Sequence, residues 1–232
     1  MDIQEYFSRI KSESQLVFEN SIIQKQKLGK LHHLSSCIHD FSSLIHDKHE
    51  KKILETVSAQ LESSNFSLAI GLYRQAFSSL RLALEMGLGA IYFSTSKLEM
   101  HEWLDGRMDI KWSILIDEEN GVLSKRFVKT FFLEMLDIAE GFRTRAKSAY
   151  RKLSEYVHGN NETWSEGSIK IKYNEEVFLK YCELYEIVTE TILFTSMCRY
   201  AKDFDDSERE SIQFLNEEFS HIQQIRDYFG RS

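Results

Sequence analysis

The chain has 232 residues, a formal net charge of −7, 42% hydrophobic and 28% charged residues, ten glycines and no proline. This composition supplies enough apolar residues for a core, while the net negative charge argues against a protein that coats nucleic acid non-specifically, because such binding needs many cationic contacts to phosphates. The scarcity of glycine and proline favours long helices joined by short polar turns over a fold built of many strands.

The N-terminal quarter of the chain is predicted to form one or two long amphipathic helices. Apolar residues recur at roughly helical spacing through residues 3–27 and 28–61, and Gly29 and the Asp47 region are possible breaks. We therefore expect an N-terminal helical extension over residues 1–62, which either packs on a bundle or reaches towards a partner.

A strongly apolar helix is expected next, after a loop at residues 63–65 whose Ser-Ser-Asn sequence is typical of helix caps. It begins at residue 66 or 67 and runs to about Ser94, with apolar and small residues on several sides, which predicts burial against more than one neighbour. Arg81 and Glu85 lie four residues apart on this helix and can pair on one face.

The rest of the chain alternates between irregular and clearly helical segments. Residues 95–120 indicate a short helix or an excursion over the bundle, and the next helix is expected to open at Gly121 and to continue, directly or across a turn near Gly141, into a basic stretch. Further helices are expected at residues 175–202 and 207–229, so the bundle is assigned to residues 63–204 and a C-terminal helix to residues 205–232.

Several features predict a soluble, cytoplasmic chain that does not enter a membrane. No uncharged apolar run reaches the ~18 residues that would be needed to cross a bilayer. The N-terminus is acidic and amphipathic, unlike a secretory signal. Cys37, Cys182 and Cys198 are widely spaced, with no CxxC pair, and are interpreted as reduced thiols rather than a disulfide framework or zinc site.

A histidine stripe in the N-terminal region has two interpretations. His32, His39 and His46 recur every seven residues, and His49 and Glu50 follow within a turn. A metal site needs ligands that converge from facing elements, and one helix stripe supplies at most two of them. We therefore favour a solvated or partner-facing stripe and predict no metal and no cofactor.

A basic stretch at residues 143–161 stands out in this acidic chain, reading RTRAKSAYRKLSEYVHGNN. Between Glu140 and Glu155 every charged side chain is positive, and Gly159 is expected to cap the end of the helix, with Asn160 and Asn161 beyond it. The cations are Arg143, Arg145, Lys147, Arg151 and Lys152.

Arg151 and His158 are the candidate catalytic residues. They lie seven residues apart, so both project from one helix face about 10 Å apart along the axis. Imidazole can take the proton of a ribose 2′-hydroxyl or give one to the departing 5′-oxygen, and a guanidinium can stabilise the phosphate oxygens. The alternative is a surface arginine and a histidine that interacts favourably with a helix C-terminus.

The side chains around this pair also have two interpretations each. Arg145, Lys147 and Lys152 are candidate phosphate contacts, and Tyr150 and Tyr156 could stack on bases or simply pack. Arg74, Arg81 and Glu85 would orient the cleft or hold Arg151, or would form a set of salt bridges alone. Ser154 and Glu155 fall between the two motif residues on the same side of the helix and are assigned with them as supporting residues.

The segment AYRKLSEYVHGN resembles the active-site helix of the HEPN superfamily (higher eukaryotes and prokaryotes nucleotide-binding domains). The signature of that helix is an arginine, four to six residues and a histidine, and six residues separate Arg151 from His158 here. The earlier stretch GLYRQAFSSLRLALEMGLGAIYFS resembles the arginine- and glutamate-bearing helix of prokaryotic HEPN proteins. Together the similarity covers about residues 65–200.

This resemblance implies an antiparallel four- or five-helix bundle that dimerises, with the two motif helices facing each other across the twofold axis. Many HEPN proteins are ribonucleases of toxin–antitoxin, phage-abortive or CRISPR-linked defence systems. One position departs from the pattern: active members often have Asn, Asp or His directly after the arginine, and Lys152 stands there in this chain. A lysine can contact phosphate but cannot accept a hydrogen bond.

The sequence therefore predicts a homodimeric, metal-independent endoribonuclease that cleaves RNA by attack of the 2′-hydroxyl, with an antitoxin or another defence-system protein as partner. Two alternatives stay open. One is a catalytically silent HEPN-like module that binds a nucleotide, RNA or protein, which Lys152 and the acidic net charge favour. The other is a helical adaptor that uses its terminal helices and depends on neither Arg151 nor His158.

Overall fold

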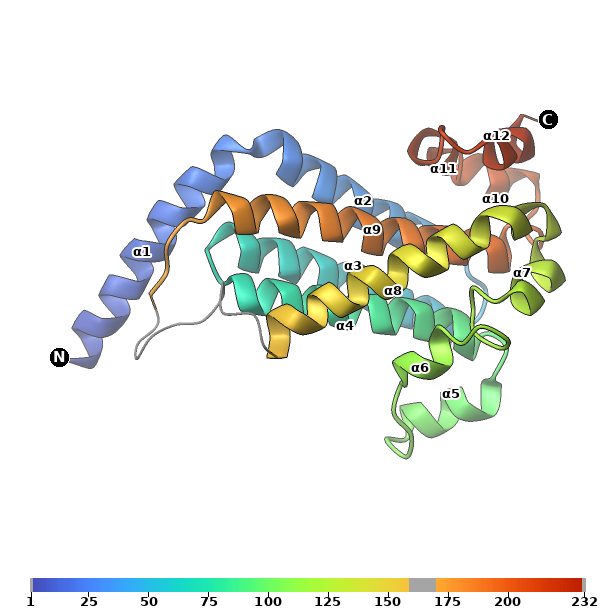
Figure 1. Cartoon of the computed structure of the whole chain (residues 1–232), viewed down its shortest axis with the longest axis horizontal. Helices are drawn as coiled ribbons and strands as arrows, with labels where there is room; N and C mark the ends of the chain where they lie inside the picture. Colours follow the sequence, from blue (N-terminus) through green and yellow to red (C-terminus); the bar gives the residue numbers. More distant parts are fainter. Residues whose placement is uncertain (1, 159–169, 231–232) are drawn as a thin grey trace.

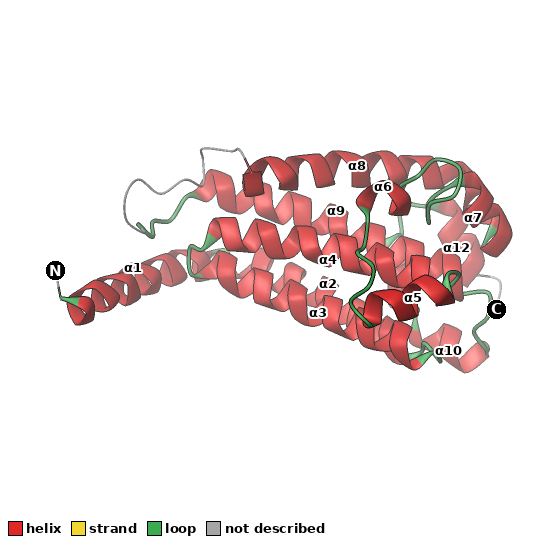
Figure 2. Ribbon diagram, turned by 90° about the horizontal axis from the view of Figure 1, so that it is seen from below, coloured by secondary structure: helices red, strands yellow, loops and turns green. Residues whose placement is uncertain are grey.

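The computed structural model describes residues 2–158 and 170–230, and every regular element within these ranges is a helix (Figures 1 and 2). The predicted all-α class is confirmed. In chain order the elements are α1 (Ile3–Ile23), α2 (Lys25–Ser43), α3 (Lys48–Ala69), α4 (Tyr73–Phe93), α5 (Lys97–Leu104), α6 (Trp112–Leu115), α7 (Lys125–Phe131), the 3-10 turn η1 (Leu133–Met135), α8 (Leu136–His158), α9 (Glu175–Tyr200), α10 (Asp206–Ser211), α11 (Phe214–Glu218) and α12 (Gln223–Phe229). Among the described residues, no helix is both long and apolar enough to span a bilayer.

The long helices α2, α3, α4, α8 and α9 form the bundle, and each runs antiparallel to the one before it (Figure 2). Helix α4 packs against α3, α8 and α9, while α2 packs against α3 and α9. Helix α9 is buried on nearly every side. It tolerates this because its threonines donate to carbonyls of their own helix, as Thr189 does to Tyr185 at 2.9 Å and Thr195 to Thr191 at 2.6 Å.

The loop predicted at residues 63–65 is wrong, because α3 continues through it to Ala69. Ser64 and Asn65 are buried, and their polar groups serve bonds between helices instead of a cap. Asn65 donates to the hydroxyl of Tyr185 at 3.1 Å and accepts from Tyr181 at 3.2 Å. Serine and asparagine favour helix caps, but they also form hydrogen bonds with buried tyrosines. The sequence alone does not show which of these two roles such a residue has.

The turn between α3 and α4 lies instead at residues 70–72, where Gly71 has φ +83°. The expected boundary between residues 62 and 63 falls inside α3, and α2 and α3 contribute buried side chains to the same core as α4 and α9. Helix α1, unlike α2 and α3, projects away from one end of the bundle (Figure 1).

Replacing Gly71 with alanine is expected to lower the free energy of unfolding by about 1–2 kcal/mol from the left-handed backbone alone. The new Cβ would also lie 2.7 Å from Cγ2 of Ile171 and 3.1 Å from Cγ1 of Val17. The matched control is Gly29→Ala, because Gly29 lies within α2 and its Cβ would meet nothing within 4 Å. That change should instead stabilise by about 0.5–1 kcal/mol. Chemical denaturation of both variants checks the sign, and equal effects would contradict the expectation.

The N-terminal helices break at Gln24 and at residues 44–47 rather than at Gly29. Asp47 caps α3 by accepting from the amides of His49 and Glu50, at 2.9 and 3.1 Å, and it also pairs with Lys97 at 2.8 Å. Partial burial alone would raise the pKa of Asp47, but the hydrogen bonds from Lys97 and the two amides outweigh it and lower the pKa to about 2. Asp47 therefore ties the start of α3 to α5.

Two predicted helices are interrupted in the structure. No helix opens at Gly121; α7 begins at Lys125, capped by Ser124, and Phe132 separates it from η1 and α8. Helix α8 then passes through Gly141 without a turn. The single helix expected over residues 207–229 is wrong, because the chain there forms α10, α11 and α12. A straight helix would extend for on the order of 35 Å, whereas the folded-back chain buries these apolar residues: Ile212, Leu215, Phe219, Ile222 and Ile225.

The three cysteines are free thiols, as predicted, and all of them are buried. Burial raises the pKa of Cys37 and that of Cys182 to about 12. The thiols therefore stay protonated at neutral pH and behave as small core residues.

Candidate functional site

The antiparallel packing of α4 on α8 brings the first turns of α4 to the C-terminal end of α8. Arg81 donates from Nη1 to Nε2 of His158 at 3.0 Å and from Nη2 to the hydroxyl of Tyr150 at 2.6 Å. Arg74, two turns earlier on α4, donates to the backbone carbonyl of Val157 at 2.5 Å. Two arginines of α4 therefore hold the last turn of α8, and one of them holds the imidazole itself.

Glu85 and Tyr150 fix the position of Arg81. The Tyr150 hydroxyl donates to Glu85 at 2.9 Å, and the Arg81 Nη2 lies 3.4 Å from the same carboxylate oxygen. Burial raises the pKa of Tyr150, and its hydrogen bond to Glu85 raises it further, so the phenol keeps the proton that it donates. The predicted Arg81–Glu85 pair is confirmed, with both side chains about one-fifth exposed (21% and 22%). It belongs to a network that includes Tyr150.

The excursion between α4 and α7 also contacts this network, through Trp112 of α6. The rings of Trp112 and Tyr150 are stacked, with centroids 4.0 Å apart and planes 3° from parallel. The guanidinium carbon of Arg81 lies 4.7 Å from the centroid of the Tyr150 ring. Trp112 is a site residue that the sequence did not predict, because its one signal there is an aromatic side chain in an irregular segment.

Arg151 and His158 both lie on α8 but have different partners. Arg151 is 84% exposed and pairs through Nε with Glu155 at 3.3 Å, whereas His158 is held by Arg81. The Ser154 hydroxyl donates to the Tyr150 carbonyl of its own helix at 2.8 Å. Gly159, Asn160 and Asn161, the expected cap, lie outside the described residues.

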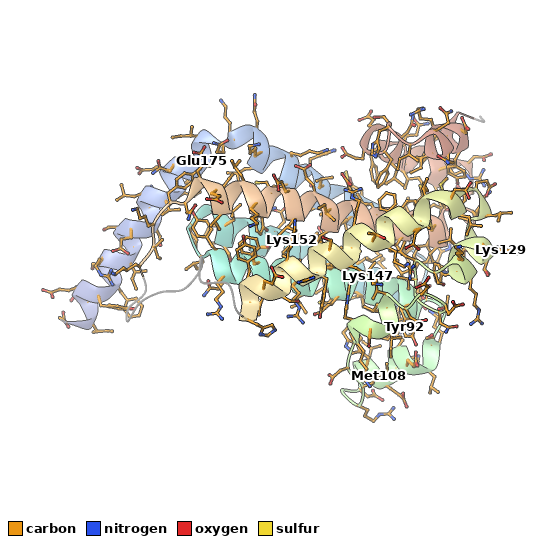
Figure 3. All side chains as sticks on the ribbon, in the orientation of Figure 1. Tyr92, Met108, Lys129, Lys147, Lys152 and Glu175 are labelled. Atoms are coloured by element: carbon orange, nitrogen blue, oxygen red, sulfur yellow. The ribbon has the colours of Figure 1, made fainter. Side chains whose placement is uncertain are left out.

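The cationic surface of α8 is smaller than the sequence indicated. Arg143 is buried and pairs with Glu140 at 2.6 Å and with Glu118 at 3.4 Å. Arg145 pairs with Glu190 of α9 at 2.5 Å. Lys147 and Lys152 are exposed on α8 (Figure 3), and within the described ranges neither has a carboxylate partner. The exposed cations of the helix are therefore chiefly Lys147, Arg151 and Lys152.

Tyr156 is buried at 2% exposure, so it cannot stack on a base as the substrate-binding assignment required. Its ring is stacked on that of Phe77 in α4, with centroids 3.8 Å apart and planes 6° from parallel. The packing interpretation holds for this tyrosine, because its position on α8 faces α4.

The N-terminal histidines pair with carboxylates from other elements. His32 lies 2.9 Å from Glu62, and His46 lies 2.9 Å from Glu208 of α10. Glu50 is buried and bonds with Tyr200 at 2.6 Å. Across residues 2–158 and 170–230, no three or more His, Cys, Asp or Glu side chains are grouped so that they could hold a metal ion.

Comparison with known protein families, curated proteins and solved structures finds no match for this chain. The features of the site that bear on its function are the imidazole of His158, the arginine that binds it, and the exposed cations on the same helix.

Proposed function

We propose that the chain is a metal-independent endoribonuclease of the HEPN type, the toxin or effector of a cytoplasmic defence or toxin–antitoxin system. The observation that carries the proposal is the placement of His158 at the end of α8, where Arg81 holds Nε2 at 3.0 Å and Glu85 and Tyr150 anchor Arg81. An exposed histidine fixed in this way, on a helix with exposed cations, suits acid–base chemistry on a phosphodiester.

In the proposed reaction, the imidazole of His158 takes the proton of a ribose 2′-hydroxyl. The 2′-oxygen forms a bond to phosphorus, the bond from phosphorus to the 5′-oxygen breaks, and the departing oxygen takes a proton from water. The hydroxide left behind removes the proton from the imidazolium. Arg151 and Lys152 donate to the non-bridging oxygens, whose negative charge grows in the transition state.

A second copy of the chain is part of this proposal. Within one chain, Arg151 pairs with Glu155 and His158 pairs with Arg81, so the two motif residues do not share a partner. If two motif helices faced each other across a twofold axis, both arginines and both histidines would line one cleft. Cross-linking or light scattering of the purified protein would test the dimer.

RNA cleaved by the purified protein in the presence of a metal chelator is expected to carry 2′,3′-cyclic phosphate and 5′-hydroxyl ends. The reason is that the ribose hydroxyl is the nucleophile, so no water adds to phosphorus. End-group analysis by labelling with polynucleotide kinase measures this outcome, and the matched control is an RNA with 2′-O-methyl groups, which should resist cleavage. Products with 5′-phosphates would contradict the proposed reaction.

A catalytically silent binding module is the second candidate, and specific contacts favour it. Arg151 is engaged by Glu155, Nε2 of His158 is occupied by Arg81, and Lys152 stands where an acceptor side chain is common in active HEPN proteins. Such a module would bind RNA or a nucleotide through the exposed cations of α8 without cleaving it. Expression in bacteria separates the two candidates, because only the enzyme would arrest growth and degrade RNA.

A further inference from the structure

Arg81 carries an incompletely satisfied guanidinium at the centre of the site. Its Nη1 and Nη2 atoms donate to His158 and Tyr150, but its Nε is buried without a hydrogen-bond partner among the described residues. The side chain is 21% exposed, so part of it reaches the surface beside the imidazole. The exposed part of this guanidinium, beside an exposed imidazole, is therefore within reach of an acceptor from outside the protein.

The Arg81 contact also determines where the proton of a neutral His158 resides. A guanidinium only donates hydrogen bonds, so Nε2 must accept, and the ring proton is therefore on Nδ1. In this arrangement neither ring nitrogen has a free lone pair. His158 cannot take a proton from a ribose hydroxyl until Arg81 moves away from Nε2.

We propose that Arg81 is a phosphate-responsive positioning residue that withholds His158 until RNA is bound. This inference rests on the proposed ribonuclease function. A phosphate of the RNA takes over the Nη1 donor of Arg81, which frees Nε2 to act as the base. The exchange is favourable because a phosphate oxygen carries negative charge and therefore accepts from the guanidinium more strongly than a neutral imidazole does.

Glu85 and Tyr150 make the exchange local. Both bind Nη2 of Arg81, so they keep the guanidinium within reach of the site while Nη1 changes its partner. Trp112 of α6 stacks on the ring of Tyr150 and holds the phenol in place. A small rotation of one end of the Arg81 guanidinium is therefore sufficient to release the imidazole.

The test is nitrogen NMR of protein labelled with ¹⁵N-histidine, at a pH at which imidazoles are neutral. His158→Gln identifies the His158 signals. In the free wild-type protein, the proton should be bonded to Nδ1. Saturation with a single-stranded 2′-deoxy oligonucleotide, which binds but lacks the nucleophile, should abolish the hydrogen bond to Nε2 and change the tautomer population from Nδ1–H alone to a mixture, in which the rings with the proton on Nδ1 have a free Nε2 lone pair. A methylphosphonate oligonucleotide of the same sequence, which lacks the phosphate charges, should leave the tautomer unchanged.

Arg81→Met should release the imidazole without any oligonucleotide, and Arg81→Lys, which retains a donor, should restore part of the Nδ1–H population. Arg74→Met is the matched control, because Arg74 lies on the same helix but binds the Val157 carbonyl rather than the imidazole. The inference is overturned if wild type and Arg81→Met show the same tautomer, or if the 2′-deoxy oligonucleotide changes nothing. Circular dichroism verifies the fold of each variant.

RNA cleavage is measured separately on the same samples, so that the two proposals can fail independently. A tautomer that responds to phosphate in a protein that never cleaves RNA would support the Arg81 exchange and refute the ribonuclease. Cleavage by a protein in which the His158 tautomer does not respond to phosphate would support the ribonuclease proposal and refute the role of Arg81.

Discussion

Replacing His158 with alanine is expected to slow RNA cleavage by about 10²–10⁴-fold, the range by which a general acid–base group contributes to catalysis. Imidazole is the side chain that general acid–base catalysis uses most often, whereas Tyr150, its neighbour in the described site, has a raised pKa and keeps its proton. Single-turnover cleavage of a short labelled RNA gives the rate, and relief of growth arrest on expression gives the cellular result.

The fold should not change in this variant, because His158 is exposed and is the last residue of α8. The matched control is His39→Ala, which removes an exposed histidine from α2 and should leave the cleavage rate unchanged. Unchanged cleavage in His158→Ala would refute the assignment of His158. Binding of RNA without cleavage by any of these proteins would favour the silent binding module.

Arg151→Ala separates the roles of the two motif residues. Loss of one group that stabilises transition-state charge costs about 10²–10³-fold in rate, so cleavage should fall while RNA still binds through Lys147 and Lys152. Because Arg151 is 84% exposed, its removal should leave the stability unchanged. Full activity in this variant would show that other cations of the site stabilise the charge on the phosphate oxygens.

Local spacing predicted the parts of the site that lie on one helix. The Arg81–Glu85 pair follows from a separation of four residues, and both motif residues lie on α8 as expected. The bond from Arg81 to His158 could not be predicted, because it depends on how far α4 is shifted along α8. Phe77 and Tyr156, which stack on each other where α4 meets α8, are aromatic residues with no polar signature.

Charges counted along one helix overstated the cationic face for a related reason. Arg143 pairs with Glu140 of its own helix and with Glu118, and Arg145 pairs with Glu190; Glu118 and Glu190 come from segments distant in the sequence. The same limit applies to Asn65, whose type indicates a cap although its partners are tyrosines of α9. The helical content could be predicted from the sequence. The pairs formed between helices could not, because they depend on how the bundle packs.

Tyr156→Ala is expected to lower the free energy of unfolding by about 3–5 kcal/mol, as for other large-to-small changes at buried aromatic residues. The ring is 2% exposed and stacked on Phe77, which in turn meets Tyr181 edge to face at 5.5 Å. Removing it leaves a cavity where α8 packs on α4. For a chain of this size the melting temperature should fall by roughly 6–20 °C.

Tyr156→Phe is the matched control, because it removes only the hydroxyl and retains the ring and its stack on Phe77, so it should cost less stability than alanine. RNA binding and stability of the alanine variant together distinguish the two roles proposed for the residue. A base-stacking tyrosine would leave the fold intact when changed to alanine and would lose about 1–3 kcal/mol of binding free energy. A packing tyrosine shows the opposite pattern, with a large loss of stability in the alanine variant. An unchanged melting temperature in Tyr156→Ala would therefore place the ring outside the core and return it to the RNA-binding surface.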